Sequence, residues 1–96
     1  MNASTKFKFR LYVAGDAENS LAAIANLREI CERCLPARHQ VELIDVLLEP
    51  MRALADGVLM TPMLIKLAPL PVRRIVGSLS QIKTVLQTLG LPALAA

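Results

Sequence analysis

Aromatic residues are scarce in this sequence, which contains two phenylalanines, one tyrosine and no tryptophan. Proteins that bind single-stranded nucleic acids stack the bases on aromatic side chains and hold the backbone in a basic groove. Here the only adjacent basic residues are Arg73 and Arg74, and the net charge is only +3. We therefore expect no nucleic acid among the partners of this protein.

Long hydrophobic runs are absent as well. No apolar run approaches the roughly 18 residues of a membrane-spanning helix. The first residues, MNASTKFKFR, lack the apolar stretch of a secretory signal peptide. We expect a cytoplasmic protein that does not associate with a membrane. In that compartment the two cysteines, Cys31 and Cys34, are more typical of free thiols than of a structural disulfide.

Few residues are available for a catalytic or cofactor site. The sequence has one histidine, His39, and none of the glycine-rich motifs that bind nucleotides. Cys31 and Cys34 form a C-x-x-C motif, but a reactive pair needs its first cysteine at the N-terminus of a helix, and these two are expected near a helix C-terminus. We interpret them as core thiols, with a redox pair and a zinc site as alternatives; zinc would need two further ligands. We expect no cofactor, no metal and no enzymatic activity.

Acidic residues are missing from the second half of the chain. All eight lie at or before Asp56, whereas residues 57–96 carry four basic residues and no acid. Apolar residues make up 54% of the sequence and charged residues 20%, so the chain is more apolar than an average domain. This composition predicts an apolar surface patch, used either for self-association as a dimer or tetramer or for binding a partner.

The first half predicts a strand, a helix and a second strand. Residues 6–13, KFKFRLYV, alternate basic and apolar side chains, which is typical of a strand with one face on a core. The helix should begin with Asn19 or Ser20 as its N-cap and end before Pro36. Its inward residues are expected to be Leu21, Ile24, Leu27, Ile30, Cys31, Cys34 and Leu35. Residues 41–47, VELIDVL, predict a strand parallel to the first, because a helical crossover joins the two.

The second half begins with a short helix and a hairpin. Pro50 suits the first turn of a helix that ends near Gly57. Its inward residues are expected to be Met51, Leu54 and Ala55. Residues 63–67 and 72–76 are two apolar runs separated by only a few residues, which predicts an antiparallel hairpin.

A last helix is expected to begin with Ser80 as its N-cap and to stop at Gly90. Its inward residues are expected to be Ile82, Val85, Leu86 and Leu89. Residues 82–89 also have branched side chains that would suit a strand, which is the alternative. Residues 91–96 are expected to form a loose tail. The length of 96 residues predicts one α/β domain, 1–96, with the order strand, helix, strand, helix, strand, strand, helix.

Proline placement marks the start of the third predicted strand. Pro62 cannot donate to a sheet ladder, so it should begin the strand rather than lie within it. Thr61-Pro62 at this place resembles the thioredoxin-type fold, in which the corresponding bond is cis. The resemblance implies that Pro62 is a structural residue that follows a cis peptide bond.

Taken in order, several segments of the chain resemble the KaiB family, the small partner proteins of the KaiC ATPase. They are LYVAG at 11–15, Asn19-Ser20, LIDV at 43–46 followed by Pro50, Thr61-Pro62, and PLPVRRIVG at 69–77 followed by Leu79-Ser80. The resemblance implies a thioredoxin-like βαβαββα fold with a mixed four-stranded sheet, or alternatively the KaiB ground-state βαββααβ fold. It also implies metamorphic behaviour, because KaiB clock proteins exchange a tetrameric ground fold for a monomeric thioredoxin-like fold that differs in the second half.

The same resemblance implies a non-enzymatic regulatory protein that docks on a KaiC-type ATPase, in a circadian-clock-like or a stress or signalling system. The expected docking residues are Ala22, Gln40, Glu42 and Gly57. Clock members tend to be basic where this chain has Glu42, which is therefore a charge reversal. Arg73 and Arg74 would supply either contact charge or fold stability. The alternative function is a small thioredoxin-like oxidoreductase or an adaptor domain.

Overall fold

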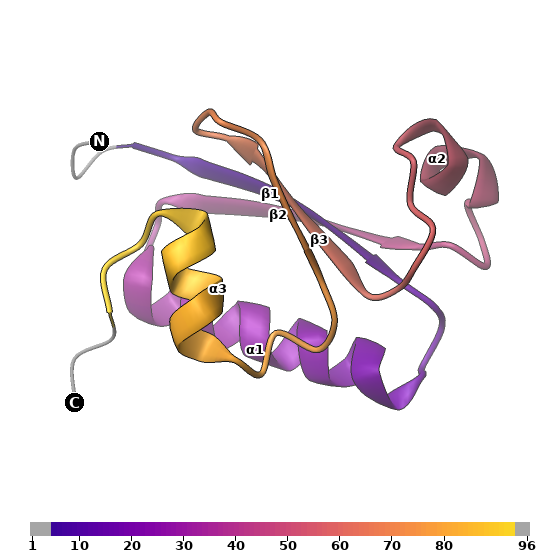
Figure 1. Ribbon diagram of the computed structural model, residues 1–96, viewed down its shortest axis with the longest axis horizontal. Helices are drawn as coiled ribbons and strands as arrows, with labels where there is room; N and C mark the ends of the chain where they lie inside the picture. Colours follow the sequence, from indigo (N-terminus) through magenta and orange to yellow (C-terminus); the bar gives the residue numbers. More distant parts are fainter. Residues whose placement is uncertain (1–4, 94–96) are drawn as a thin grey trace.

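The structure is a computed structural model that describes residues 5–93. Its elements are β1 (Phe7–Val13), α1 (Glu18–Cys34), β2 (His39–Asp45), α2 (Pro50–Ala55), β3 (Met63–Ala68), β4 (Arg73–Val76) and α3 (Ile82–Leu89). The four strands form one sheet in the order β2-β1-β3-β4 (Figure 1). β1 pairs with β2 in parallel and with β3 antiparallel, and β3 pairs with β4 antiparallel. The predicted βαβαββα order and mixed sheet are confirmed, and residues 82–89 form a helix rather than a strand.

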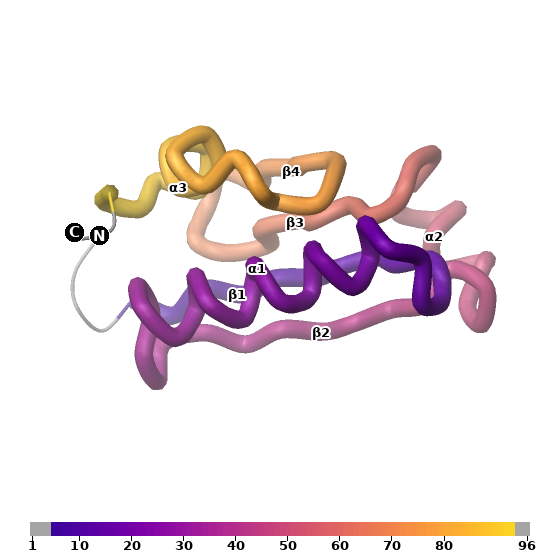
Figure 2. The backbone as a smooth tube through the Cα atoms, turned by 90° about the horizontal axis from the view of Figure 1, so that it is seen from below, coloured from indigo at the N-terminus to yellow at the C-terminus, as the bar shows by residue number. Residues whose placement is uncertain are grey.

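One face of the sheet carries most of the core, and α1 and α3 cover it (Figure 2). The alternation in β1 places Phe7, Phe9 and Leu11 on this face, where all three are buried. The cluster that they form with α1, β3 and α3 contains fifteen buried residues. Burial of this apolar surface is the main contribution to the stability of the fold.

The opposite face of the sheet has a smaller core. Tyr12, Ile44, Met63 and Ile65 from the strands pack there with Ala53 of α2. α2 is only six residues long and lies at one end of the molecule (Figure 1). A large part of this face therefore has no helix over it.

The predicted N-cap of α1 is wrong. The helix begins at Glu18, with Ala17 as the N-cap, so Asn19 and Ser20 are helical residues. Ser20 is buried, and its Oγ accepts a hydrogen bond from the backbone N–H of Ala14 at 3.1 Å. Its hydroxyl thus holds the preceding loop rather than the helix terminus. The prediction that Leu21 faces inward is also wrong, since this side chain is exposed.

The predicted inward face of α2 is wrong as well. Met51, Leu54 and Ala55 are exposed, and Ala53 is the buried residue of this helix. The reason is tertiary, because the end of α2 is bound to β1 by side-chain hydrogen bonds, and these bonds turn Ala53 toward the sheet. The apolar spacing of the sequence alone does not contain this constraint.

The remaining boundaries differ from the prediction by a few residues. β2 runs from His39 to Asp45 rather than over 41–47, and β4 begins at Arg73. The N-cap of α3 is Gln81, whereas the hydroxyl of Ser80 is bonded to that of Ser78 at 3.1 Å. Short helices and strands are ended by their neighbours as much as by local preference.

The C-terminal stop of α3 is Gly90, as predicted, in a left-handed conformation with φ 76°. The predicted tail is wrong for Leu91, which is buried and donates its N–H to the carbonyl oxygen of Leu86 at 2.8 Å. Residues 94–96 of that tail lie outside the described residues.

Three proline peptide bonds are cis. One is Thr61–Pro62, at the entry to β3. The other two are Ala68–Pro69 and Leu70–Pro71, in the connection between β3 and β4, for which the sequence analysis made no prediction. None of the helices within residues 5–93 is both long and apolar enough to cross a membrane.

Candidate functional site

A network of five polar side chains joins β1, β2 and α2 on the less covered face of the sheet. Arg10 donates from Nε to Glu42 Oε1 at 3.0 Å and from Nη1 to Asp56 Oδ2 at 2.9 Å. Arg52 donates from Nη1 to Glu42 Oε2 at 2.7 Å. The Tyr12 hydroxyl donates to Asp56 Oδ2 at 2.5 Å, and the carbonyl oxygen of Arg52 lies 3.1 Å from it. The network therefore ties the C-terminal part of a short helix, at Arg52 and Asp56, to the sheet.

The charges of this network shift the pKa values of its members. Hydrogen bonds from Arg52 and Arg10 lower the pKa of Glu42 to about 2. The hydrogen bond from Tyr12 and that from Arg10 lower the pKa of Asp56. Burial, followed by the contact with Asp56, raises the pKa of Tyr12 to about 12. Near neutral pH both carboxylates are ionised and the tyrosine is protonated, which is the state that these hydrogen bonds require.

The structure separates the docking residues expected from the sequence. Gln40 and Glu42 alternate with Val41 on β2, so both point to the α2 face, and Gly57 follows α2. Ala22 lies on α1, which covers the opposite face. Glu42 forms ion pairs with two arginines of its own chain, Arg10 of β1 and Arg52 of α2, so its carboxylate links β2 to both elements.

The other two expected contact residues lie at the far edge of the sheet. Arg73 and Arg74 belong to β4, three strands away from Glu42. They are neighbours in a strand, so they point to opposite faces. Arg74 donates from Nη1 to the sulfur of Met63 at 3.6 Å. Arg73 lies opposite Lys66, whose ammonium group is 5.8 Å from the centre of the Phe7 ring and whose pKa is lowered by burial and by Arg73.

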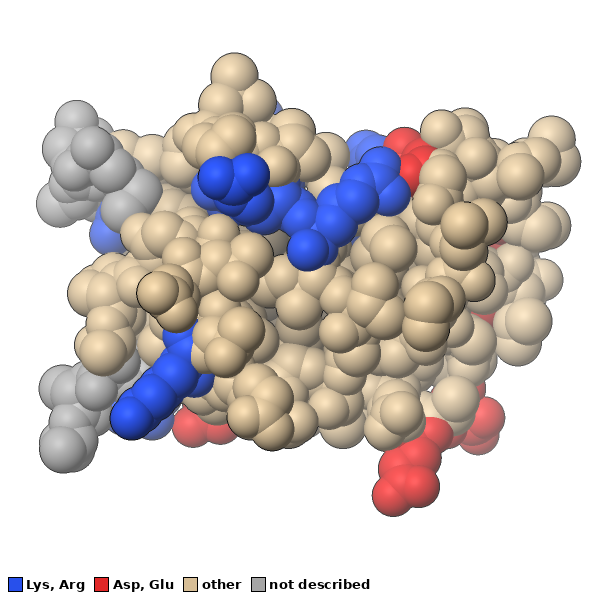
Figure 3. Space-filling model, in the orientation of Figure 1, with Lys and Arg blue, Asp and Glu red and all other residues tan. Residues whose placement is uncertain are grey.

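An apolar surface that the sequence analysis did not locate surrounds α2. Six large apolar side chains of residues 47–60 are each at least 63% exposed, and they are half of all the exposed large apolar side chains in residues 5–93. We call this set the α2 surface: Leu47, Leu48, Met51, Leu54, Leu59 and Met60. The corresponding end of the molecule is largely uncharged in the view of Figure 3. The sequence contains a signal for this surface. The apolar pairs Leu47-Leu48 and Leu59-Met60 flank a helix that is too short to bury them.

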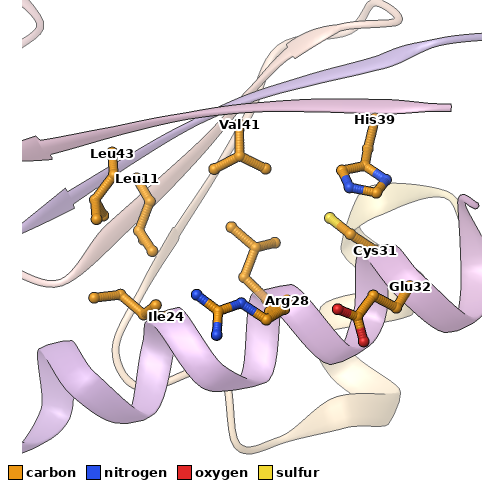
Figure 4. Close-up of a pocket in the computed structure, with 9 residues that line it drawn as sticks. Leu11, Ile24, Arg28, Cys31, Glu32, His39, Val41 and Leu43 are labelled. Atoms are coloured by element: carbon orange, nitrogen blue, oxygen red, sulfur yellow. The ribbon is translucent and has the colours of Figure 1, made fainter. Parts of the chain in front are cut away.

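A groove lies between α1 and the outer strand β2 (Figure 4). Its volume is about 510 Å³, and the residues that line it are Leu11, Ile24, Leu27, Arg28, Cys31, Glu32, His39, Val41 and Leu43. His39 Nδ1 is 2.7 Å from the carbonyl oxygen of Leu35, so this nitrogen carries a proton and donates it. The groove is mostly apolar.

The position and the surroundings of the two cysteines do not favour a reactive pair. Both are free, and they lie at the C-terminal end of α1, as the sequence predicts. Burial raises the pKa of Cys31 to about 12 and also raises that of Cys34. A thiol with so high a pKa forms almost no thiolate near neutral pH, and the thiolate is the nucleophile. Within the described residues, no three His, Cys, Asp or Glu side chains are grouped so that they could hold a metal ion.

Comparison with solved structures shows the class of the fold. The N-terminal domain of Synechococcus elongatus SasA has a TM-score of 0.72 with this chain at 17% identity, covering 94% of this chain and 89% of that domain. Mitochondrial thioredoxin 3 from Saccharomyces cerevisiae has a TM-score of 0.71 at 12% identity, covering 93% of this chain and 82% of that protein. The fold is thioredoxin-like.

Comparison with protein families gives the narrower assignment. The family model for the KaiB domain matches residues 10–91. The circadian clock oscillator protein KaiB of Prochlorococcus marinus is 45% identical over 91 residues, which are 95% of this chain and 85% of that protein. The circadian clock protein KaiB3 of Synechocystis sp. is 45% identical over 77 residues, which are 80% of this chain and 76% of that protein. The chain belongs to the KaiB family.

Proposed function

We propose that this chain is a cytoplasmic, non-enzymatic regulatory protein that docks on a KaiC-type ATPase, in a circadian-clock-like or a stress or signalling system. The relatives with the highest similarity reported above are named circadian clock proteins, and this relationship supports a regulatory role. The raised pKa values of both thiols speak against the alternative, a small thioredoxin-like oxidoreductase.

The observation that carries the proposal is the α2 surface. A monomeric domain rarely leaves a contiguous patch of large apolar side chains in water unless the patch binds something. Here Met51 and Leu54 belong to α2, and the other four side chains belong to the connections that flank it. Hydrogen bonds with β1 and β2 hold α2, so this helix gives the surface a defined framework. Gly57, one of the expected docking residues, follows Asp56, the C-cap of this helix. The α2 surface is the centre of the proposed docking site.

Glu42 is a poor residue for testing this proposal. Its carboxylate lies between Arg10 and Arg52, so Glu42→Lys would place a third cation against two others. Such a change would loosen α2 whether or not Glu42 touches a partner. A sharper test changes side chains that are well exposed and lie outside this polar network.

The experiment is a pull-down from lysate of the source organism, with recovered proteins identified by mass spectrometry, followed by titration of the purified KaiC-type ATPase. Leu54→Asp, within the α2 surface, is expected to weaken binding about tenfold or more, because a charge replaces a central apolar contact. Leu70→Asp is the matched control, since Leu70 is equally apolar and exposed but lies in the β3–β4 connection. Recovery of no KaiC-type ATPase, or equal weakening by both variants, would contradict the proposal.

We also propose that the chain self-associates. β2 is an edge strand with the exposed apolar residues Val41 and Leu43, so a second copy can pair along it. A stable twofold interface would bury about 800 Å² on each partner. Light scattering at micromolar concentration should give the mass of a dimer or tetramer, and a monomer mass would contradict this.

A further inference from the structure

Within residues 5–93, no strand pairs with the outer edge of β4. β4 is the last strand of the sheet and pairs only with β3. It is short and lies beside α3 in Figure 2. An open edge presents backbone N–H and C=O groups that can pair with another chain.

The register identifies the backbone groups that face outward. In an antiparallel pair, opposite residues alternate between hydrogen-bonded and non-hydrogen-bonded positions. Gly77 N–H donates to the carbonyl oxygen of Pro62 at 2.9 Å, which makes this pair a hydrogen-bonded one. Val76 opposite Met63 is therefore non-hydrogen-bonded, and so is Arg74 two residues earlier. The N–H and C=O groups of Arg74 and Val76 point away from β3, with the two-residue spacing that an added strand needs.

Two neighbouring side chains of this edge are basic. Arg73 and Arg74 are exposed, and neither takes part in any ion pair found within residues 5–93. The positive charge of Arg74 lowers the pKa of Asp56, but that carboxylate is already bound by Arg10 and Tyr12. In Figure 3 basic side chains gather on the face that is in view. No acid follows Asp56 in the sequence that could neutralise the edge.

A second copy of this chain does not fit the edge. Two β4 strands paired with each other would bring the arginines of one copy against those of the other, and like charges in opposed positions destabilise a strand pair. A partner strand with acidic side chains at two neighbouring positions would place one carboxylate on each face, near Arg73 and Arg74 respectively. Val72, which is half exposed, and Ile75, which is partly buried, would lie opposite the apolar residues on either side of the acids.

We propose that the outer edge of β4 binds an extended acidic segment of a partner protein as a fifth strand of the sheet. Backbone hydrogen bonds to Arg74 and Val76 provide the pairing, and the two arginines select for acidic side chains. This site is distinct from the α2 surface in the elements that form it and in the chemistry that it recognises.

The test is a titration with a synthetic peptide whose centre reads valine-glutamate-glutamate-valine, observed by amide NMR and hydrogen exchange. We expect slower exchange of the Arg74 and Val76 amides and binding that weakens with added salt. A peptide with glutamine in place of both glutamates should bind about tenfold more weakly. The double variant Arg73→Ala, Arg74→Ala should lose affinity for the glutamate peptide by a similar factor.

A second variant tests the backbone part of the proposal. Val76→Pro removes an outward N–H group without removing a bond to β3, since proline is tolerated on an edge strand when its nitrogen faces solvent. It should weaken peptide binding while both arginines remain. Leu54→Asp should leave peptide binding unchanged, so failure at this edge is distinguishable from failure of the α2 surface. Equal binding of the glutamine peptide, protection at β2 instead of β4, or no change at millimolar peptide would overturn the proposal. Preferential binding of single-stranded DNA at the same arginines would overturn it too.

Discussion

The two faces of the sheet are held together differently. The face under α1 and α3 has a cluster of fifteen buried apolar residues, whereas the face under α2 has a cluster of five. On the second face, α2 is held mainly by polar contacts and less by apolar packing. These contacts are the hydrogen bonds and ion pairs of Arg10, Tyr12, Glu42, Arg52 and Asp56. The helix can then turn its apolar side chains outward, so one face serves mainly the stability of the fold and the other is available for binding.

Truncation of a core residue on the α1 face should have the largest effect. Leu27 is buried between α1 and the sheet. Leu27→Ala should lower the free energy of unfolding by about 2 to 5 kcal/mol, because it removes apolar contacts and leaves a cavity. Chemical denaturation followed by circular dichroism measures this change.

The matched variant on the other face is Leu54→Ala, which makes the same change at an exposed position. Its free energy of unfolding should stay within about 0.5 kcal/mol of wild type. If both variants are destabilised equally, α2 is packed more extensively than the two clusters indicate, and the contrast between the faces fails.

Removal of one hydroxyl should test the polar network. Tyr12→Phe keeps the buried ring and deletes the hydrogen bond to Asp56. We expect a loss of about 1 to 2 kcal/mol, because hydrogen bonds to charged groups exceed neutral ones but this carboxylate keeps Arg10 as a partner. The same denaturation assay applies, and an unchanged midpoint would show that the network does not hold α2.

The network should also make stability depend on acid pH. The pKa of Glu42 in the folded protein is about 2, below its ordinary value of 4.5, and the pKa of Asp56 is lowered too. A lowered pKa contributes stability that is fully present above the ordinary value and is lost as the pH falls toward the folded value.

The denaturant concentration at the unfolding midpoint of wild type should therefore decrease as the pH is lowered from about 4.5 to about 2. Glu42→Gln should be less stable than wild type at neutral pH, and the difference should shrink over the same interval. Because Glu42 is well exposed, added salt should reduce the effect. A constant difference across this pH range would assign the stability to other groups.

The smallest expected effect is the reactivity of the native thiols toward a labelling reagent. Cys31 is buried and its pKa is raised to about 12, so a thiol reagent at pH 8 should modify it only after denaturation. Cys34 is partly exposed and should react slowly in the native protein. Mass spectrometry after timed labelling, with the denatured chain as reference, distinguishes the two sites. Rapid native labelling of Cys31 would reopen the oxidoreductase alternative.

Much of the architecture could be predicted because it depends on local pattern. The alternation of residues 6–13 fixes which side of β1 faces the core, and the helical spacing before Pro36 predicts α1 and its parallel crossover. The two short apolar runs after Pro62 predict the hairpin of β3 and β4. Gly90 predicts the end of α3 by itself, because glycine readily adopts the left-handed conformation of a helix C-terminus. The exchange between two folds, implied by the KaiB resemblance, stays a prediction.

The candidate site could be predicted only in part. Gly57 was placed at the end of the correct helix, but the apolar residues beside it were assigned inward, and Glu42 was treated as a contact residue. Both errors concern side chains whose partners are distant in the sequence. Arg10 meets Asp56 across 46 positions and Glu42 across 32, and no local pattern encodes such a pairing.

The sequence by itself predicted the order of elements and the resemblance to the KaiB family, because periodicity, proline and glycine positions and short motifs are properties of neighbouring residues. It left the thioredoxin-like fold and the KaiB ground-state fold as alternatives, and the structure decided for the first. Only the tertiary structure decided which side of α2 meets the sheet, which carboxylate is held internally and which strand edge stays open. These outcomes depend on hydrogen bonds and apolar contacts between segments that are distant in the sequence. Such interactions contribute to stability only when the sheet has formed and has brought the segments together.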